Sequence, residues 1–243
     1  MTEQHTALIT GADRGVGLAL AAQLLNKGWQ VIAGRYLTQW KGLDELQSQY
    51  PDQLRIVELN VGDDQSVATA ARQVSEWTDK LDMVINNAAM LGDIQTTIGD
   101  ELNFNEMLQA FNVNSLGALR VTNGFLPQIL RSDSKLIVNI SSEAGSVANC
   151  WRTSWFGYAM SKSALNMQSM LVHRGLKDKG GRVLLLHPGH VQSYMQGELD
   201  NSGKYTPEQS AAAILKLAER RLGDEWNGEE LALIDPEGQV IPW

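Results

Sequence analysis

A tyrosine and a lysine four residues apart stand in a segment of helical period. Tyr158 and Lys162 therefore lie on one face of a helix. Such an isolated pair is more often structural, but this one follows a loop that carries Ser141 and Ser142 and ends a β-type run. A free tyrosine ionises near pH ~10, so its phenolate needs a nearby positive charge to form near neutrality. Lys162 can supply that charge, and the position of the pair favours a functional role over a structural one.

A glycine-rich turn is the second candidate site. It lies between a β-type run and a helical one and reads Thr10-Gly11-Ala12-Asp13-Arg14-Gly15-Val16-Gly17-Leu18. Glycines at this place let the backbone turn tightly and approach a pyrophosphate, whose charge the N–H groups and the dipole of the following helix stabilise. The strand before the turn and the helix after it favour phosphate binding over a plain connection.

The elements that must position these residues alternate along the chain. Short β-type runs cover residues 6–10, 30–33, 54–59, 82–86, 135–141, 182–187 and 231–234. Helical periodicity covers residues 15–27, about 37–50, 64–80, about 103–130, about 155–179 and 207–222. This alternation predicts an α/β fold, a Rossmann-like, doubly wound parallel sheet of about seven strands flanked by helices. Because no repeat or linker divides the sequence, we expect one domain over residues 1–243.

Composition and charge exclude several classes of function. The chain has 243 residues, of which 43% are hydrophobic, and a formal net charge of −8, which disfavours nucleic acids and anionic membrane surfaces as partners. The single cysteine, Cys150, excludes an internal disulfide, and the four histidines lack the spacing of a metal site. No secretion signal or membrane span is recognisable. These features predict a cytoplasmic protein without a bound metal.

Further motifs follow in an order that resembles the short-chain dehydrogenase/reductase superfamily. The glycine spacing TGxxxGxG is similar to that of the superfamily, and Tyr158 to Lys162 matches YxxSK. The other matches are Asn86-Asn87-Ala88-Ala89, Asn114 in its helix, the strand and loop from Val138 to Gly145, and Pro188-Gly189-His190-Val191-Gln192-Ser193. Within the superfamily, the segments 157–167 and 235–243 look like C-factor and sniffer-type carbonyl reductases.

The resemblance implies a role for each matching residue. Tyr158 would be the general acid or base, Lys162 would bind the nicotinamide ribose, and Ser142, with Ser141 as its rival, would polarise the substrate oxygen. Asn114 would anchor a water chain that returns the proton to solvent. Besides Tyr158 and Lys162, the positions that would contact the cofactor are Gly11, Asp13, Arg14, Gly15, Val16, Gly17, Arg35, Asn60, Val61, Asn87, Ala88, Ala89, Pro188, Gly189, Val191 and Ser193.

The end of the second β-type run bears on the choice of cofactor. Relatives that select NAD carry an acidic residue there, whereas this chain has Arg35 and, in the glycine turn, Arg14. Both arginines can pair with a 2′-phosphate, so we expect NADP(H) to be preferred, with NAD(H) as the alternative. Asn60 replaces the usual aspartate near the adenine and can still accept its hydrogen bond.

Two loops are expected to border the substrate. Sixteen positions separate Ser142 from Tyr158, a long loop for the superfamily. Its Trp151, Trp155 and Phe156 are expected either to line an apolar substrate pocket or to pack against the body of the protein or a second subunit. Cys150 in the same loop is expected to be a buried, inert thiol. Residues of about 190–206 are polar and glycine-containing, as in a substrate-covering loop or a passive connection.

Three functions fit these observations. The first is an NADP(H)-dependent reductase of aldehydes or ketones, reversible as an alcohol dehydrogenase. The alternative is a nucleotide-binding signalling protein of C-factor type with little or no turnover, although such a protein has no use for a proton donor. A sugar-nucleotide epimerase is disfavoured by the glycine spacing. The superfamily also implies a homodimer or homotetramer, for which residues 164–176 offer an apolar stripe.

Overall fold

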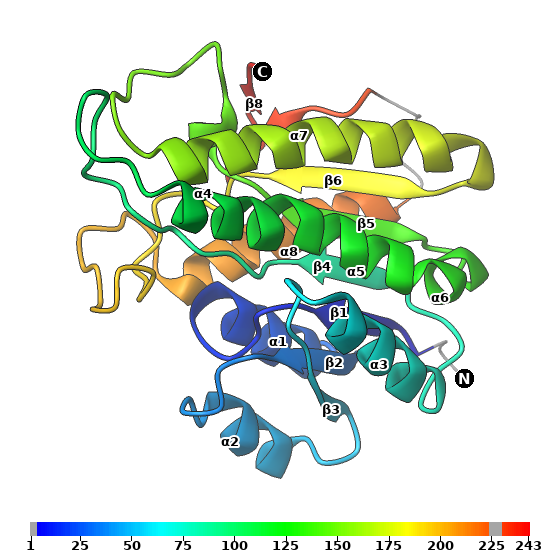
Figure 1. Ribbon diagram of the computed structural model, residues 1–243. Coiled ribbons are helices and arrows are strands. Elements are labelled where there is room, and N and C mark those ends of the chain that lie inside the picture. Colours follow the sequence, from blue (N-terminus) through cyan, green and yellow to red (C-terminus); the bar gives the residue numbers. More distant parts are fainter. Residues whose placement is uncertain (1–3, 224–229) are drawn as a thin grey trace.

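One eight-stranded sheet organises the chain. The computed structural model describes residues 4–223 and 230–243 (Figure 1). The strands lie in the order β3-β2-β1-β4-β5-β6-β7-β8, and all neighbours are parallel except β7 and β8. Their bounds are β1 (Thr6–Ile9), β2 (Gln30–Arg35), β3 (Leu54–Glu58), β4 (Met83–Asn86), β5 (Leu136–Ile140), β6 (Arg182–Leu186), β7 (Leu233–Ile234) and β8 (Val240–Ile241).

This sheet confirms the predicted α/β fold, with one addition. Seven strands lie where the sequence predicts them, and the eighth, β8, was missed because it has only two residues. It returns antiparallel to β7 through a turn in which Gly238 adopts a positive φ of 84°. A two-residue strand has no readable alternation of its own, so only pairing with β7 defines it.

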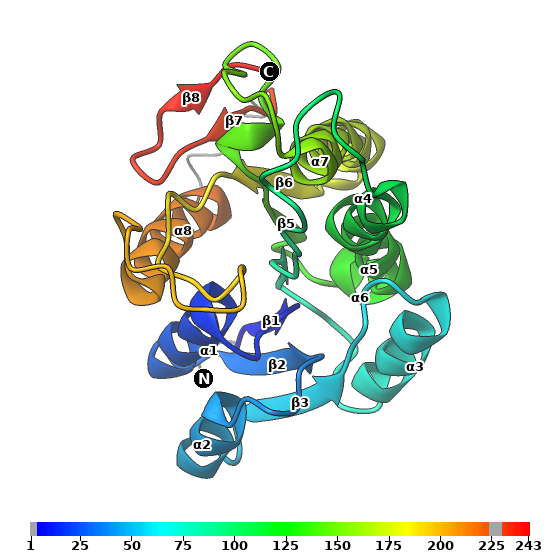
Figure 2. The ribbon, with the colours of Figure 1, turned by 60° about the vertical axis from the view of Figure 1, so that its left-hand side comes forward.

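Helices cover both faces of the sheet (Figure 2). One face carries α1 (Gly15–Asn26), α2 (Gly42–Gln49) and α8 (Pro207–Leu222). The opposite face carries α3 (Asp64–Ser75), α4 (Phe104–Phe111), α5 (Ala118–Gly124), α6 (Leu126–Arg131) and α7 (Phe156–Leu176), with the short turns η1 (Asn112–Gly117), η2 (Glu143–Gly145) and η3 (Lys177–Lys179). Among the described residues, no helix is both long and apolar enough to cross a membrane.

Three predicted helices differ from the structure for local reasons. The helix expected from residue 37 begins only at Gly42, because Asp13 accepts hydrogen bonds from the backbone of Tyr36 and Leu37. The helix expected to reach residue 80 ends at Ser75, and beyond it the Thr78 side chain bonds to the backbone of Lys80 instead. The long helix of residues 103–130 is divided into α4, a π-helical turn η1, α5 and α6.

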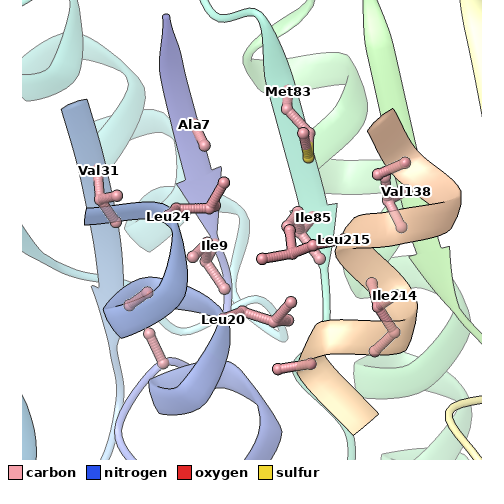
Figure 3. Close-up of a cluster of buried hydrophobic side chains, with 14 of the residues drawn as sticks. Ala7, Ile9, Leu20, Leu24, Val31, Met83, Ile85, Val138, Ile214 and Leu215 are labelled. Atoms are coloured by element: carbon pink, nitrogen blue, oxygen red, sulfur yellow. The ribbon is translucent and has the colours of Figure 1, made fainter. Parts of the chain in front are cut away.

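The two faces of the sheet bury separate apolar layers. Figure 3 shows Ala7, Ile9, Met83 and Ile85 of the strands packed against Leu20 and Leu24 of α1 and Ile214 and Leu215 of α8. Alternate strand residues such as Leu8, Val84 and Ile137 face the other layer. Because both faces are covered, the central strands are predominantly apolar, which is the usual condition of a parallel sheet.

A buried polar seam joins the strands to α7 below the strand ends. The amide of Asn86 in β4 donates to Asn139 in β5 (2.7 Å), which donates to Ser169 in α7 (2.8 Å). Asn86 also donates to Thr122 of α5. Unpaired buried polar groups are unfavourable, so this chain of bonds fixes the position of α7 along the sheet.

Replacing the central member of this seam tests its contribution to stability. We expect Asn139→Ala to lower the free energy of unfolding by about 1–3 kcal/mol, because two buried hydrogen bonds are lost. Urea denaturation measures the change, and Asn123→Ala on an exposed position of α5 is the control. Equal stability of the two variants would contradict the role of the seam.

Candidate active site

The predicted site residues meet at the carboxyl ends of the parallel strands. The loops after β4, β5 and β6 gather at this end of the sheet, at the left of Figure 1. Ser142 follows β5, and Tyr158 and Lys162 lie in the first turns of α7. All three side chains are buried. Ligands of doubly wound folds bind at this edge of the sheet.

Ser142, rather than its neighbour, reaches the tyrosine. The Ser141 hydroxyl donates to the Asn166 side chain in α7 and is held there. The Ser142 hydroxyl is hydrogen-bonded to the Tyr158 side chain. The same serine oxygen also accepts a hydrogen bond from the backbone N–H of Ala144 (3.1 Å). Ser142 is therefore the serine that contacts Tyr158, whereas the Ser141 hydroxyl is bonded to α7.

Burial governs the protonation of both Tyr158 and Lys162. Burial raises the pKa of Tyr158 to about 12, against the hydrogen bond with Ser142. Burial also lowers the pKa of Lys162 to about 7. The Lys162 amine donates to the carbonyl of Ile140 (2.8 Å) and lies 5.6 Å from the centroid of the Tyr158 ring. This differs from the expected lowering of the tyrosine pKa, because burial disfavours the phenolate more than the hydrogen bond with Ser142 and the charge of Arg152 favour it.

Asn114 connects two segments of the site from the π-helical turn η1. Its side chain accepts from the backbone of Met90 (2.8 Å) and donates to the carbonyl of Met90 (2.9 Å) and to the Ser161 hydroxyl (2.9 Å). Both amide hydrogens are therefore used within the protein, and only a lone pair of the amide oxygen is left for a water molecule. The structure shows Asn114 holding the loop after β4 against α7.

The glycine turn has the shape that a dinucleotide needs. Gly11 and Gly15 adopt positive φ angles of 61° and 57°. A Cβ atom on Gly17 would lie 2.2 Å from the carbonyl oxygen of Gly11 and 2.6 Å from the amide nitrogen of Asn87, so no side chain fits there. No side chain caps the start of α1 at Arg14. Backbone N–H groups at an uncapped helix start bind phosphate well, so the turn fits a pyrophosphate.

Several predicted contact residues hold the shape of the turn. Thr10 accepts from the backbone of Asn87 and Ala88, and Asn87 donates to the carbonyls of Thr10 and Gly11, all at 3.0 Å. Ala89 follows on the same segment and is half-buried. Asp13 accepts from Tyr36 (2.9 Å) and Leu37 (3.1 Å), and burial raises the pKa of its carboxyl despite these bonds. These residues support the cradle.

The residues after β3 already have hydrogen-bond partners within the protein. The Asn60 amide oxygen accepts from the backbone of Gly62 (2.9 Å), and the carbonyl of Val61 accepts from Arg120 (2.6 Å). Asn60 can therefore meet an adenine only with its remaining lone pair. Val61 is buried, and Val16 is half-buried in the first turn of α1.

The two arginines expected at a 2′-phosphate differ sharply in their surroundings. Arg35 already pairs with Asp44 (3.0 Å) and Glu58 (3.2 Å). The Arg14 guanidinium instead faces the rings of Trp40 (4.9 Å) and Tyr194 (5.9 Å), and no carboxylate of the described residues pairs with it. Arg14 is thus the better placed of the two. Trp40 and Tyr194 carried no motif and were missed in the sequence.

The segment after β6 forms a loop closed at its base. Gly189 has a φ of 85°, and a Cβ atom there would lie 2.5 Å from the ring of Tyr205. The carbonyl of Pro188 accepts from Ser210 (2.7 Å), Val191 bridges to Tyr205, and the carbonyl of Ser193 accepts from Asp200 (2.9 Å). Residues 190–206 therefore form a closed loop beside the site.

The long loop between Ser142 and Tyr158 differs from the prediction at Cys150, and its aromatic residues lie in different surroundings. Cys150 is exposed, so the expected buried thiol is wrong, because this part of the loop lies on the surface. Trp151 is also exposed, whereas Trp155 packs edge-on against the Tyr158 ring with centroids 5.9 Å apart. Phe156 begins α7. Of the aromatic residues of the loop, Trp155 touches the predicted catalytic tyrosine.

Metal chemistry finds no support in the described part of the chain. No group of three or more His, Cys, Asp or Glu side chains within residues 4–223 and 230–243 is arranged to hold a metal ion.

Comparisons with known proteins agree with this geometry. The family model of the short chain dehydrogenases matches residues 5–203. The C-signal protein of Myxococcus xanthus is 31% identical over 68% of this chain and 95% of its own. An NADPH-bound carbonyl reductase from chicken fatty liver is 30% identical, with a TM-score of 0.87 over 99% of this chain and 100% of its own. The Drosophila melanogaster carbonyl reductase Sniffer shares the fold, with 22% identity and a TM-score of 0.89 over 99% of this chain and 100% of its own. The chain therefore belongs to the short-chain dehydrogenase family of oxidoreductases.

Proposed function

We propose that this chain is an NADP(H)-dependent carbonyl reductase that also oxidises the corresponding alcohols. The observation that carries the proposal is the buried group of Ser142, Tyr158 and Lys162 beside the glycine cradle. The similar chicken enzyme is a carbonyl reductase with NADPH bound, which supports the choice of substrate and cofactor. A binding-only signalling protein would not need a buried proton donor, so the structure favours turnover.

The residues of this chain divide the work of the reaction among them. A reduced nicotinamide, when bound, supplies the hydride to the carbonyl carbon. Ser142 donates a hydrogen bond to the carbonyl oxygen, and the Tyr158 hydroxyl transfers its proton to that oxygen. A pKa near 12 keeps Tyr158 protonated at neutral pH, which suits an acid. Lys162, whose amine lies 5.6 Å from the centroid of the Tyr158 ring, would bind the ribose of the nicotinamide.

The remaining contacts would hold the cofactor along the strand ends. The turn from Gly11 to Gly17 would bind the pyrophosphate, and Arg14 would bind the 2′-phosphate. Ser193 would contact the carboxamide. Residues 1–243 would form a single domain. In it, the loop of residues 190–206 would cover the substrate, and Trp155 would form an apolar wall of the substrate pocket.

The exposed apolar residues of α4 and α7 support a homodimer or homotetramer. Leu108 in α4 and Met167 and Leu171 in α7 are 66%, 64% and 65% exposed, and the two helices lie side by side (Figures 1 and 2). Of the stripe expected in residues 164–176, Leu165 and Leu176 pack into the core instead. Association would bury the apolar side chains that remain. We place the protein in the cytoplasm, where its free Cys150 thiol suits reducing conditions.

Tyr158→Phe tests the acid. We expect turnover of an active carbonyl substrate to fall about 10²- to 10⁴-fold, because the proton is removed while the ring stays. Cofactor affinity should hardly change. A panel of aldehydes, ketones, quinones and diketones, followed by nicotinamide absorbance, identifies the substrate and measures the loss. Tyr50→Phe, at the end of α2, is the matched control. Nearly unchanged kcat for Tyr158→Phe would rule out the assignment.

Cofactor selection should depend on Arg14. We expect NADPH to bind at least about tenfold more tightly than NADH, because a charge-assisted pair contributes about 1.5–3 kcal/mol. Arg14→Gln should remove most of this preference, whereas Arg35→Gln should change it less, because Arg35 is already paired. Titration calorimetry measures both affinities. Equal affinities in the unmodified protein would count against the cofactor assignment.

Assembly can be tested through the same helices. Light scattering at micromolar concentration should give at least twice the chain mass of 26.8 kDa. Met167→Glu together with Leu171→Glu should shift the protein to monomers, because charges disfavour an apolar contact. Ile98→Glu, at an exposed position outside both helices, should leave the mass unchanged. A fully active monomer would show that α4 and α7 do not form an interface.

A further inference from the structure

A half-buried ion pair bridges the long loop between Ser142 and Tyr158, and its Glu143 side chain is 34% exposed. The Arg152 guanidinium donates to both carboxylate oxygens of Glu143, one of them at 3.1 Å. The Arg152 side chain is only 9% exposed. Glu143 directly follows Ser142, so the pair connects the middle of the loop to the serine end of the site.

The same arginine also contacts the tyrosine end of the loop. Its guanidinium lies 4.6 Å from the ring centroid of Trp155 and 4.5 Å from that of Trp151. Trp155 packs edge-on against Tyr158, with 5.9 Å between the ring centroids. Trp155 precedes α7 in a left-handed conformation with a φ of 67°, which is strained for a residue with a side chain. Such a conformation persists only where surrounding contacts hold it.

These contacts form an unbroken path from Ser142 to Tyr158. We propose that Arg152 is a positioning residue of the reaction, which with Glu143 and Trp155 holds the Tyr158 hydroxyl at its distance from Ser142. The proposal rests on the proposed function, because it assumes that Tyr158 is the proton donor. Arg152 lies within the long loop, ten positions after Ser142 and six before Tyr158.

A purely stabilising role would explain the location of the Arg152–Glu143 pair beside Ser142 and Tyr158 less well than a positioning role does. A half-buried pair gains little net stability, because solvent weakens the attraction at Glu143 and desolvation of Arg152 opposes it. A bidentate arginine fork, in contrast, fixes distances and angles. Reacting groups must be placed closely, and a displacement of about 1 Å can lower a rate about 10²-fold.

The charges of the pair act on the tyrosine in opposite directions. The Glu143 carboxylate raises the pKa of Tyr158 and the Arg152 guanidinium lowers it, after the larger effect of burial. Lys162 faces the ring from α7, and Leu91 and Ile94 of the loop after β4 pack in the apolar cluster that contains Tyr158.

One further titratable group faces the ion pair. His187, at the end of β6, interacts with both Glu143 and Arg152, and burial lowers its pKa, so it is neutral at pH 7. Asp235 and Glu237 act on this histidine. Removing the charge of Glu143 should therefore lower the pKa of Tyr158, and removing the charge of Arg152 should raise it.

Two single variants and a rescue variant test the proposal. We expect Arg152→Gln to lower kcat/KM for carbonyl reduction about tenfold or more, with little change in cofactor affinity. Alcohol oxidation needs ionised Tyr158, so its rise with pH should move to higher pH in Arg152→Gln and to lower pH in Glu143→Gln. Arg152→Lys keeps the charge without the fork, and should restore the pH profile but not the rate. Arg55→Gln, at an exposed position of the edge strand β3, is the control.

A second readout does not require turnover. In NMR spectra of ¹³C-tyrosine-labelled full-length chain, the Tyr158 signal is assigned by its loss in Tyr158→Phe. Ionisation of Tyr158 should begin at lower pH in Glu143→Gln than in the wild type, and at higher pH in Arg152→Gln. Shifts in the same direction, or none in either variant, would overturn the proposal even if Arg152→Gln proved unstable. A different result would refute only the proposed function: a wild type without activity, in which the two variants still shift the ionisation of Tyr158 in the expected, opposite directions. Arg152 would then remain a group that positions Tyr158.

Discussion

The close docking of α7 onto the end of β5 is the constraint on which the site depends. The backbone of η2 runs so near the helix that a Cβ atom on Gly145 would lie 2.8 Å from the carbonyl carbon of Lys162. The carbonyl of Gly145 accepts from Ser163 (2.9 Å) and Asn166 (3.1 Å). These bonds join α7, at Ser163 and Asn166, to the loop that carries Ser142. Tyr158 and Lys162 are thereby placed relative to the serine without any direct bond between the lysine and the serine.

This docking has a thermodynamic consequence for the lysine. Lys162 is buried with its amine on the carbonyl of Ile140, and its pKa falls from 10.5 to about 7. Between these two values the unfolded chain binds more protons than the folded one, so this group makes the fold more stable as pH rises. At neutral pH the fold therefore holds a group that weakens it. Active sites commonly retain such groups, since function needs them in a fixed, desolvated position.

Local patterns predicted much of the fold and the site. Strand and helix alternation located seven of the strands, and short motifs located Tyr158, Lys162, Ser142 and the glycine turn, because each depends on neighbours in sequence. Long-range contacts decided the rest. The pairing of Arg35 with Glu58 joins adjacent strands, and β8 exists only through β7. The exposure of Cys150 depends on the path of a loop that has no period to interpret.

The partners of the two arginines show why residue type alone misjudged their roles. A guanidinium is useful to a phosphate only when no carboxylate competes for its hydrogen bonds, and Arg35 has two such competitors. Arg14 has aromatic neighbours instead, and these restrict its motion without neutralising its charge. One of them, Tyr194, belongs to the loop after β6, and the other, Trp40, follows β2. The Arg14 side chain thus connects the glycine turn to the loop over the proposed substrate site.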